Sequence, residues 1–179
     1  MLVKAVFWLP DAGFWAILAG MSNYTVPGLT EENAKTLITE LQARLGDYND
    51  LHLILKHAHW NVVGPNFIAV HEMIDPQVEL VRAYADTVAE RIATLGGEPD
   101  GTPRGLSTDR SPLAYDVQKG STKEHLDALD KTYVEVIENV RASLKTSGEI
   151  DPITEDIFIG QAAELEKFQW FVRAHLDNA

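Results

Sequence analysis

The sequence predicts an all-α protein, a four-helix bundle in which one long crossover connection carries a short extra helix. Four long segments repeat their apolar residues at the three- and four-residue spacing of a packed helix face, and no segment of comparable length alternates like a strand. The connection is rich in glycine and proline and covers residues 96–120, between the second and third helical segments. A chain of 179 residues suffices for one such domain with a sizeable core.

The first helix is predicted to follow Thr30, whose hydroxyl can cap its N-terminus, and to end at Gly64-Pro65. Glu31 and Glu32 would interact favourably with the positive end of the helix dipole. The apolar stripe of this helix includes two histidines: Leu41, Leu45, Tyr48, His52, Leu55 and His59.

The second helix is predicted over residues 67–95, with a regular seam on its packed face. The seam advances in alternating steps of four and three residues, which is typical of bundle packing: Ile74, Val78, Val81, Ala85, Val88, Ile92 and Leu95. Pro76 cannot donate a hydrogen bond to the carbonyl of Glu72, so a kink or local break is expected there. Gly96-Gly97 should end the helix.

The last two helices are predicted from their termini. Within the connection, one short helix is expected near residues 111–116. The third helix should start with a capping box formed by Ser121 and Glu124 and end near residues 145–148. The fourth should start at Asp151-Pro152, where the aspartate caps the helix and the proline takes the first helical position, and run to the chain end.

Residues 1–20 differ from the rest and are expected to be an N-terminal extension of a bundle domain over residues 21–179. They are mainly apolar, Lys4 is their only basic residue, and Pro10-Asp11 interrupts the run. The preferred interpretation is an over-long gene start with Met21 as the true first residue, and the alternative is a signal peptide. No apolar run approaches the ~18 residues that span a bilayer, so no membrane segment is expected.

The chain is strongly acidic and contains no cysteine. Its 15 Lys and Arg residues face 27 Asp and Glu residues, which gives a net charge of −12 at pH 7. Such a field repels nucleic-acid phosphates and attracts cations. The absence of cysteine excludes disulfides, thiol catalysis and cysteine-ligated zinc or iron–sulfur sites, and it fits a cytosolic (cytoplasmic) protein.

Two pairs of residues on the second helix have a spacing suited to metal ligands. His71 and Asp75 are four residues apart, as are Asp86 and Glu90, so each pair shares a helix face on a flank of the apolar seam. Imidazole and carboxylate groups suit iron, manganese or zinc. The competing interpretation is that either pair alone is a solvated hydrogen bond or an acidic surface. Other candidates are interpreted as structural residues: His52, His57 and, taken alone, Trp60.

One helix cannot complete such a site. Asp75 and Asp86 are about 16 Å apart along the helix axis. Two copies of the helix, antiparallel about a two-fold axis near Leu80-Val81, would bring the histidine pair of one against the acidic pair of the other. His59, at the end of the preceding helix, could then reach in. The sequence also lacks the Glu-x-x-His spacing of iron sites inside a single bundle.

At these residues the sequence closely resembles the Dps family of miniferritins, DNA-binding proteins from starved bacterial cells, and looks most like its actinobacterial members. The resemblance covers about residues 25–177 and is strongest in three segments: KHAHWNVVGPNFIAVHEMIDPQ, YADTVAERIATLGG and LEKFQWFVRAHL. It implies a ferritin-like fold and a homododecameric shell, built on two-fold dimers around an iron-mineral cavity, with ferroxidase sites at the two-fold interfaces.

The resemblance also implies an activity. Fe(II) would be oxidised at these sites, preferably by hydrogen peroxide, and stored as Fe(III) oxide, which protects the cell from oxidative damage. Trp60 matches a tryptophan beside the family's site and would act as a radical sink. The family's iron ligands fall on His59, His71 and Asp75 of one subunit and on Asp86 and Glu90 of its neighbour.

The sequence differs from many family members in the terminal segments that bind DNA. Many relatives bind DNA through a terminal tail rich in lysine and arginine, whereas here the chain stops at RAHLDNA, and Lys4 is the only cation before Lys35. Weak or absent DNA binding is therefore expected. Asp127 and Asp130 could line entry pores, but ordinary helix-surface charge is the favoured interpretation. The alternatives to iron storage are nucleoid compaction with a secondary iron activity and a shell with vestigial sites.

Overall fold

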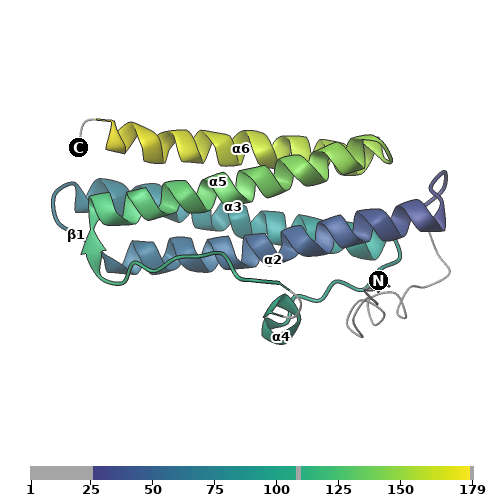
Figure 1. Cartoon of the computed structure of the whole chain (residues 1–179), viewed down its shortest axis with the longest axis horizontal. Coiled ribbons are helices and arrows are strands. Elements are labelled where there is room, and N and C mark those ends of the chain that lie inside the picture. Colours follow the sequence, from purple (N-terminus) through teal and green to yellow (C-terminus); the bar gives the residue numbers. More distant parts are fainter. Residues whose placement is uncertain (1–25, 108–109, 178–179) are drawn as a thin grey trace, which may run out of the picture.

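Figure 1 shows the protein, a computed structural model, as four long helices that lie side by side with a connection running along them. The structure describes residues 26–107 and 110–177. The long helices are α2 (Glu31–Asn61), α3 (Phe67–Thr94), α5 (Thr122–Gly148) and α6 (Pro152–Leu176). The predicted all-α four-helix bundle with a long crossover connection that carries a short extra helix is confirmed. The expectations for residues 1–20 and for Met21 concern positions outside the described residues.

Three helices start as the sequence predicts. The hydroxyl of Thr30 accepts a hydrogen bond at 3.2 Å from an N–H group in the first turn of α2. Ser121 and Glu124 form a reciprocal capping box before α5. Asp151 accepts a hydrogen bond at 2.9 Å from an N–H group in the first turn of α6. Each cap satisfies a donor that has no partner within its own helix. Among the described helices, none is both long and apolar enough to cross a membrane.

Of the kink or local break expected at Pro76, the structure excludes the break, because α3 continues through the proline without interruption. Pro76 is exposed, whereas Ile74, Gln77 and Val78 on either side of it are buried. The proline therefore faces solvent, where water can hydrate the carbonyl that lacks its helical donor. Packing of the neighbouring side chains keeps the helix continuous.

The short helix of the crossover is α4 (Pro103–Ser107), so its predicted position near residues 111–116 is wrong. The sequence signal for α4 is at its start. The hydroxyl of Thr102 accepts a hydrogen bond at 3.1 Å from an N–H group within α4, and proline takes the first helical position. The later segment has no regular secondary structure; its Leu113 is buried in the core and donates its N–H to Asp50 at 3.0 Å.

The bundle consists of two antiparallel helix pairs. α2 packs along α3, α5 packs along α6, and a short turn joins the helices of each pair. The crossover carries the chain back along the bundle, so that α5 starts beside the end of α2 (Figure 1). There, β1 (Val62–Val63) and β2 (Gly120–Ser121) pair in parallel.

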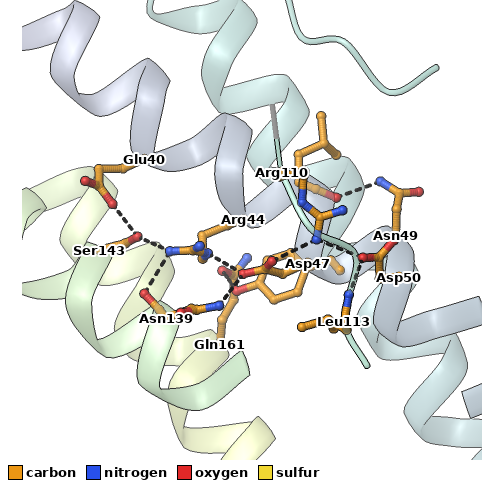
Figure 2. A network of polar contacts seen from close by, with 12 residues as sticks. Glu40, Arg44, Asp47, Asn49, Asp50, Arg110, Leu113, Asn139, Ser143 and Gln161 are labelled. Carbon is orange, nitrogen blue, oxygen red and sulfur yellow. Dashed lines mark hydrogen bonds and ion pairs between the residues drawn. The ribbon is translucent and has the colours of Figure 1, made fainter. Parts of the chain in front are cut away.

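A buried polar network ties the crossover to α2 and α5 (Figure 2). Arg44 donates to Asp47 at 2.9 Å and to a serine hydroxyl of α5 at 2.7 Å. Arg110 of the crossover donates to Asp47 at 3.1 Å and to Asp50 at 2.8 Å. A methyl group on Gly46 would lie 2.8 Å from the Arg110 guanidinium, so this glycine within α2 leaves the room that the arginine needs.

Candidate metal centre

Two histidines from neighbouring helices meet at one end of the bundle. His59 lies in the last turn of α2 and His71 in the second turn of α3, and the short connection between these helices brings them together. Their ring centroids are 3.6 Å apart, and the ring planes are inclined by 23°. His59 is buried and His71 is half-buried. Both are candidate ligands from the sequence, and the structure stacks them in direct contact.

Each of these histidines is hydrogen-bonded to the backbone of the other. Nδ1 of His59 lies 3.0 Å from the carbonyl oxygen of His71, and Nδ1 of His71 lies 2.9 Å from the carbonyl oxygen of His59. Only a protonated nitrogen can donate to a carbonyl, so in the neutral rings both Nδ1 atoms carry the hydrogen and both Nε2 atoms keep a lone pair. An imidazole oriented in this way through Nδ1 is suited to bind a metal through Nε2.

Asp75 lies beside the two histidines, and we refer to His59, His71 and Asp75 as the half-site. Oδ1 of Asp75 is 3.3 Å from Nδ1 of His59 and accepts a hydrogen bond from Nζ of Lys56 at 2.7 Å. The hydrogen bond from Lys56 lowers the pKa of Asp75 and outweighs the opposing effect of desolvation. Asp75 is therefore an ionised carboxylate at neutral pH, and its side chain is exposed to solvent.

Lys56 is a functional candidate that reasoning from the sequence missed. It lies three residues before His59 and therefore on the same side of α2. The spacing Lys-x-x-His is the signal that could have found it. A lysine on a helix surface is common, however, and the sequence does not indicate which residue of another helix it contacts. In the structure its ammonium group is the counter-ion of the one carboxylate in the half-site.

The two remaining candidate ligands lie elsewhere on the chain. Asp86 and Glu90 are exposed on α3, and Asp86 is about 16 Å along the helix axis from Asp75. Within residues 26–107 and 110–177, no group of three or more His, Cys, Asp or Glu residues is arranged to hold a metal ion. The fold therefore brings His59, His71 and Asp75 together and leaves Asp86 and Glu90 apart from them.

Two large apolar side chains are exposed on α2, and one of them adjoins the half-site. Trp60 follows His59 directly and is 71% exposed, and Leu53 is 62% exposed. These two residues are seven apart and so lie on one face of α2. Exposed apolar groups of this size on one face are typical of a surface that another protein covers.

The fold and a family profile together define the class. A four-helix bundle with one long crossover is the ferritin-like architecture. A family profile described as a ferritin-like domain matches residues 38–179 of the chain. The class is therefore that of ferritin-like proteins.

Individual relatives narrow the class to a family. The chain is 57% identical over 159 residues to the DNA protection during starvation protein of Mycolicibacterium smegmatis. The aligned region covers 89% of this chain and 87% of the relative. Two solved structures are also 57% identical and match 87% of this chain. The tetragonal form of Mycobacterium smegmatis Dps has a TM-score of 0.85 over 94% of its length, and DpsA14 from Streptomyces coelicolor has 0.84 over 93%. The chain belongs to the Dps family of ferritin-like proteins.

Proposed function

We propose that this protein is a miniferritin that binds Fe(II), oxidises it at sites between two subunits and stores Fe(III) oxide in a hollow shell. The observation that carries the proposal is the half-site, in which two stacked imidazoles, each held through Nδ1 by a backbone carbonyl, lie next to an ionised carboxylate. Nitrogen and carboxylate ligands suit iron. The net charge of −12 supports the proposal because it draws cations toward the protein.

A second copy of the chain would complete each site. If two α3 helices cross antiparallel about a two-fold axis near Leu80-Val81, Asp86 and Glu90 of the partner subunit come against the half-site. The exposed Trp60 beside it supplies apolar surface for the contact. A two-fold contact is self-complementary, so each dimer would hold two equivalent sites. The family resemblance favours a homododecamer built from such dimers.

Iron is the substrate of the proposed reaction, with hydrogen peroxide as the preferred oxidant. Two Fe(II) ions each give one electron to one peroxide molecule, which takes up two protons and becomes two water molecules. No hydroxyl radical is released, because both electrons arrive together. Trp60, next to His59 in the chain, would donate an electron to any radical that does form. The reaction consumes both iron and peroxide and so protects the cell from oxidative damage.

A nucleoid-compacting DNA-binding protein with secondary iron activity is the second candidate. The name of the M. smegmatis relative, DNA protection during starvation protein, favours it. The net charge of −12 opposes it, because binding to a phosphate backbone depends on an excess of cations. Either function would be performed in the cytoplasm.

Anaerobic iron loading tests the proposed function. The protein is given Fe(II) without oxygen and then hydrogen peroxide, while the absorbance of Fe(III) and the iron retained after desalting are measured. We expect rapid oxidation and iron that stays with the protein. The double variant His59→Ala/His71→Ala should oxidise iron no faster than protein-free solution. Equal rates for the variant and the wild type would exclude the half-site as the place of oxidation.

A further inference from the structure

A cluster of side chains that the proposed reaction does not use joins the crossover to the end of α2. It contains His57, two residues before His59, with Tyr115 of the crossover and His125 in the first turn of α5. Nε2 of His57 lies 2.9 Å from the carbonyl oxygen of Val117. The hydroxyl of Tyr115 lies 2.6 Å from Nδ1 of His125. We call His57, Tyr115, Val117 and His125 the crossover anchor.

The rings of the crossover anchor pack closely. His57 meets Tyr115 edge-on, with centroids 6.0 Å apart and planes at 80°, and Tyr115 lies 6.1 Å from His125 at 26°. His125 is fully buried, and this burial lowers its pKa, so the ring is neutral at pH 7. Burial also raises the pKa of Tyr115, which keeps its proton. Both partners are thus in the states that allow a hydrogen bond between them.

The crossover anchor and the half-site hold opposite sides of the same helical turn. His57 and His59 are two residues apart, which corresponds to about 200° around the helix axis. His59 accordingly contacts His71 of α3, whereas His57 contacts the crossover. The position of the last turn of α2 therefore depends on both sets of contacts.

Backbone contacts from the same part of the chain reach the segment between α2 and α3. Val62, directly after α2, pairs with Gly120 of β2. The hydroxyl of Thr122 donates to the carbonyl of Pro65 at 3.2 Å. The crossover and the start of α5 thus contact both ends of the turn that separates the two stacked histidines.

We propose that His57 and Tyr115 are positioning residues for the half-site. Through its hydrogen bond to Val117, His57 sets the position of the last turn of α2 and with it the distance between His59 and His71. Tyr115 holds the crossover in place by its bond to the buried His125. The inference rests on the proposed function, since it concerns the same metal ligands. Groups that orient ligands from behind commonly change metal affinity by about 10–100-fold when they are removed.

Cobalt(II) binding to the full chain under anaerobic conditions is the test, because its visible absorption reports ligand geometry as well as affinity. His57→Leu removes the donor to Val117, and we expect binding at least about tenfold weaker with a changed spectrum. His57→Gln keeps a side-chain N–H that can reach the same carbonyl, and it should bind like the wild type. Tyr115→Phe removes only the hydroxyl and should weaken binding in the same direction as His57→Leu.

Tyr48→Phe is the matched control. The hydroxyl of Tyr48 donates to Oε1 of Gln161 at 2.7 Å, and the residue is fully buried about 16 Å along α2 from His59. This variant should lose thermal stability much as Tyr115→Phe does but bind cobalt like the wild type. Unchanged binding in His57→Leu, or equal weakening in both tyrosine variants, would overturn the inference. A wild-type protein that binds no cobalt would instead overturn the proposed function itself.

Discussion

The reciprocal contacts of His59 and His71 leave both rings with the same nitrogen free. Each Nδ1 is satisfied by a carbonyl of the other histidine's backbone, so neither ring needs a carboxylate to orient it. Oδ1 of Asp75 also lies 3.3 Å from Nδ1 of His59, but its closest partner is Nζ of Lys56 at 2.7 Å. An incoming metal ion would meet two oriented imidazoles and one carboxylate that is neutralised by a displaceable ammonium group.

Replacing Lys56 with methionine should strengthen metal binding. The change keeps most of the side-chain length but removes a positive charge next to the half-site and releases Asp75. We expect anaerobic Fe(II) binding to become tighter by up to about fivefold, since one partly exposed charge contributes up to about 1 kcal/mol. Titration calorimetry measures it. The control is Lys35→Met, which removes another exposed α2 lysine that is paired with a carboxylate. Weaker binding in Lys56→Met would show that the lysine supports the site.

The same substitution should change the pH dependence of binding. Lys56 holds the pKa of Asp75 below its ordinary value in the wild type, so Asp75 stays ionised to lower pH. Without Lys56 the pKa rises toward the ordinary value, and protonation at Asp75 competes with metal at a higher pH. We expect the pH below which metal binding is lost to be higher in Lys56→Met than in the wild type. If metal binding is lost at the same pH in both proteins, Asp75 does not bind the metal.

The sequence predicted the helices well because their signals are local. Caps such as Thr30 and Asp151 act within one turn, and the apolar seam of α3 records which face is packed. The position of α4 was predicted wrongly, and α3 shows no break at Pro76, because both features depend on tertiary packing. Similarly, a spacing rule can choose His71 as a ligand, but the stacking of its ring depends on the geometry of the turn before α3.

The stability of the start of α6 should decrease in acid because Asp151 becomes protonated. This carboxylate caps the helix and accepts hydrogen bonds from the Thr154 hydroxyl and from Arg91 of α3, the latter at 2.7 Å. Burial raises its pKa, but the hydrogen bonds and the charge of Arg91 outweigh burial, so the folded-state pKa is lowered. The stability that Asp151 contributes is therefore fully present above the pKa of an unfolded aspartate, about 3.9. It is lost as the pH falls from that value through the lower pKa of Asp151 in the folded protein.

Asp151→Asn should destabilise the protein at pH 7 by about 3 kcal/mol, because asparagine can still cap the helix but leaves Arg91, whose side chain is only 10% exposed, without its charge partner. Urea unfolding at pH 7 and again near pH 3 measures the difference, which should shrink in acid. Asp156→Asn is the control, since Asp156 is exposed on the same helix and its loss should have little effect at either pH. A constant difference across pH would contradict the assignment.

On the scale of the whole molecule, the chain is one helical bundle whose five candidate ligands lie in two separate places. His59, His71 and Asp75 lie at one end of the helix pair, and Asp86 lies about 16 Å further along α3. The rise of an α-helix is enough to predict from the sequence that one chain cannot bring all five candidate ligands to one ion. Which surfaces of two chains meet cannot be derived from one chain, so the completed site stays a prediction.

Mixing two inactive variants tests whether the site is shared. His71→Ala/Asp75→Ala subunits lack two of the three half-site residues, and Asp86→Ala/Glu90→Ala subunits lack the acidic pair. Each variant alone should have every site impaired. In a mixed dimer one site loses all four of these ligands while the other regains all four, so co-assembled protein should recover part of the wild-type rate of iron oxidation. Native mass spectrometry verifies co-assembly. Mixed dimers with no recovered activity would rule out a shared site.

DNA binding should be weak or absent at physiological salt. The net charge of −12 repels phosphate, and only a local excess of cations could release counterions from DNA. A gel-shift titration with plasmid DNA at about 150 mM salt, where charges are screened beyond about 8 Å, measures the affinity. The same titration at low salt serves as the sensitive reference. Tight complexes at the higher salt would favour the nucleoid-compacting alternative.

The antiparallel pairing of α2 with α3 also has a consequence for biosynthesis. All five candidate ligands lie between His59 and Glu90, within this first hairpin, whereas the crossover anchor and the contact between Val62 and Gly120 require the later half of the chain. Translation therefore releases a hairpin that already carries the proposed dimer surface while α5 and α6 are still inside or near the ribosome. Neighbouring ribosomes on one messenger RNA would present these hairpins to each other. Subunit pairing could then begin during synthesis, before either bundle is closed.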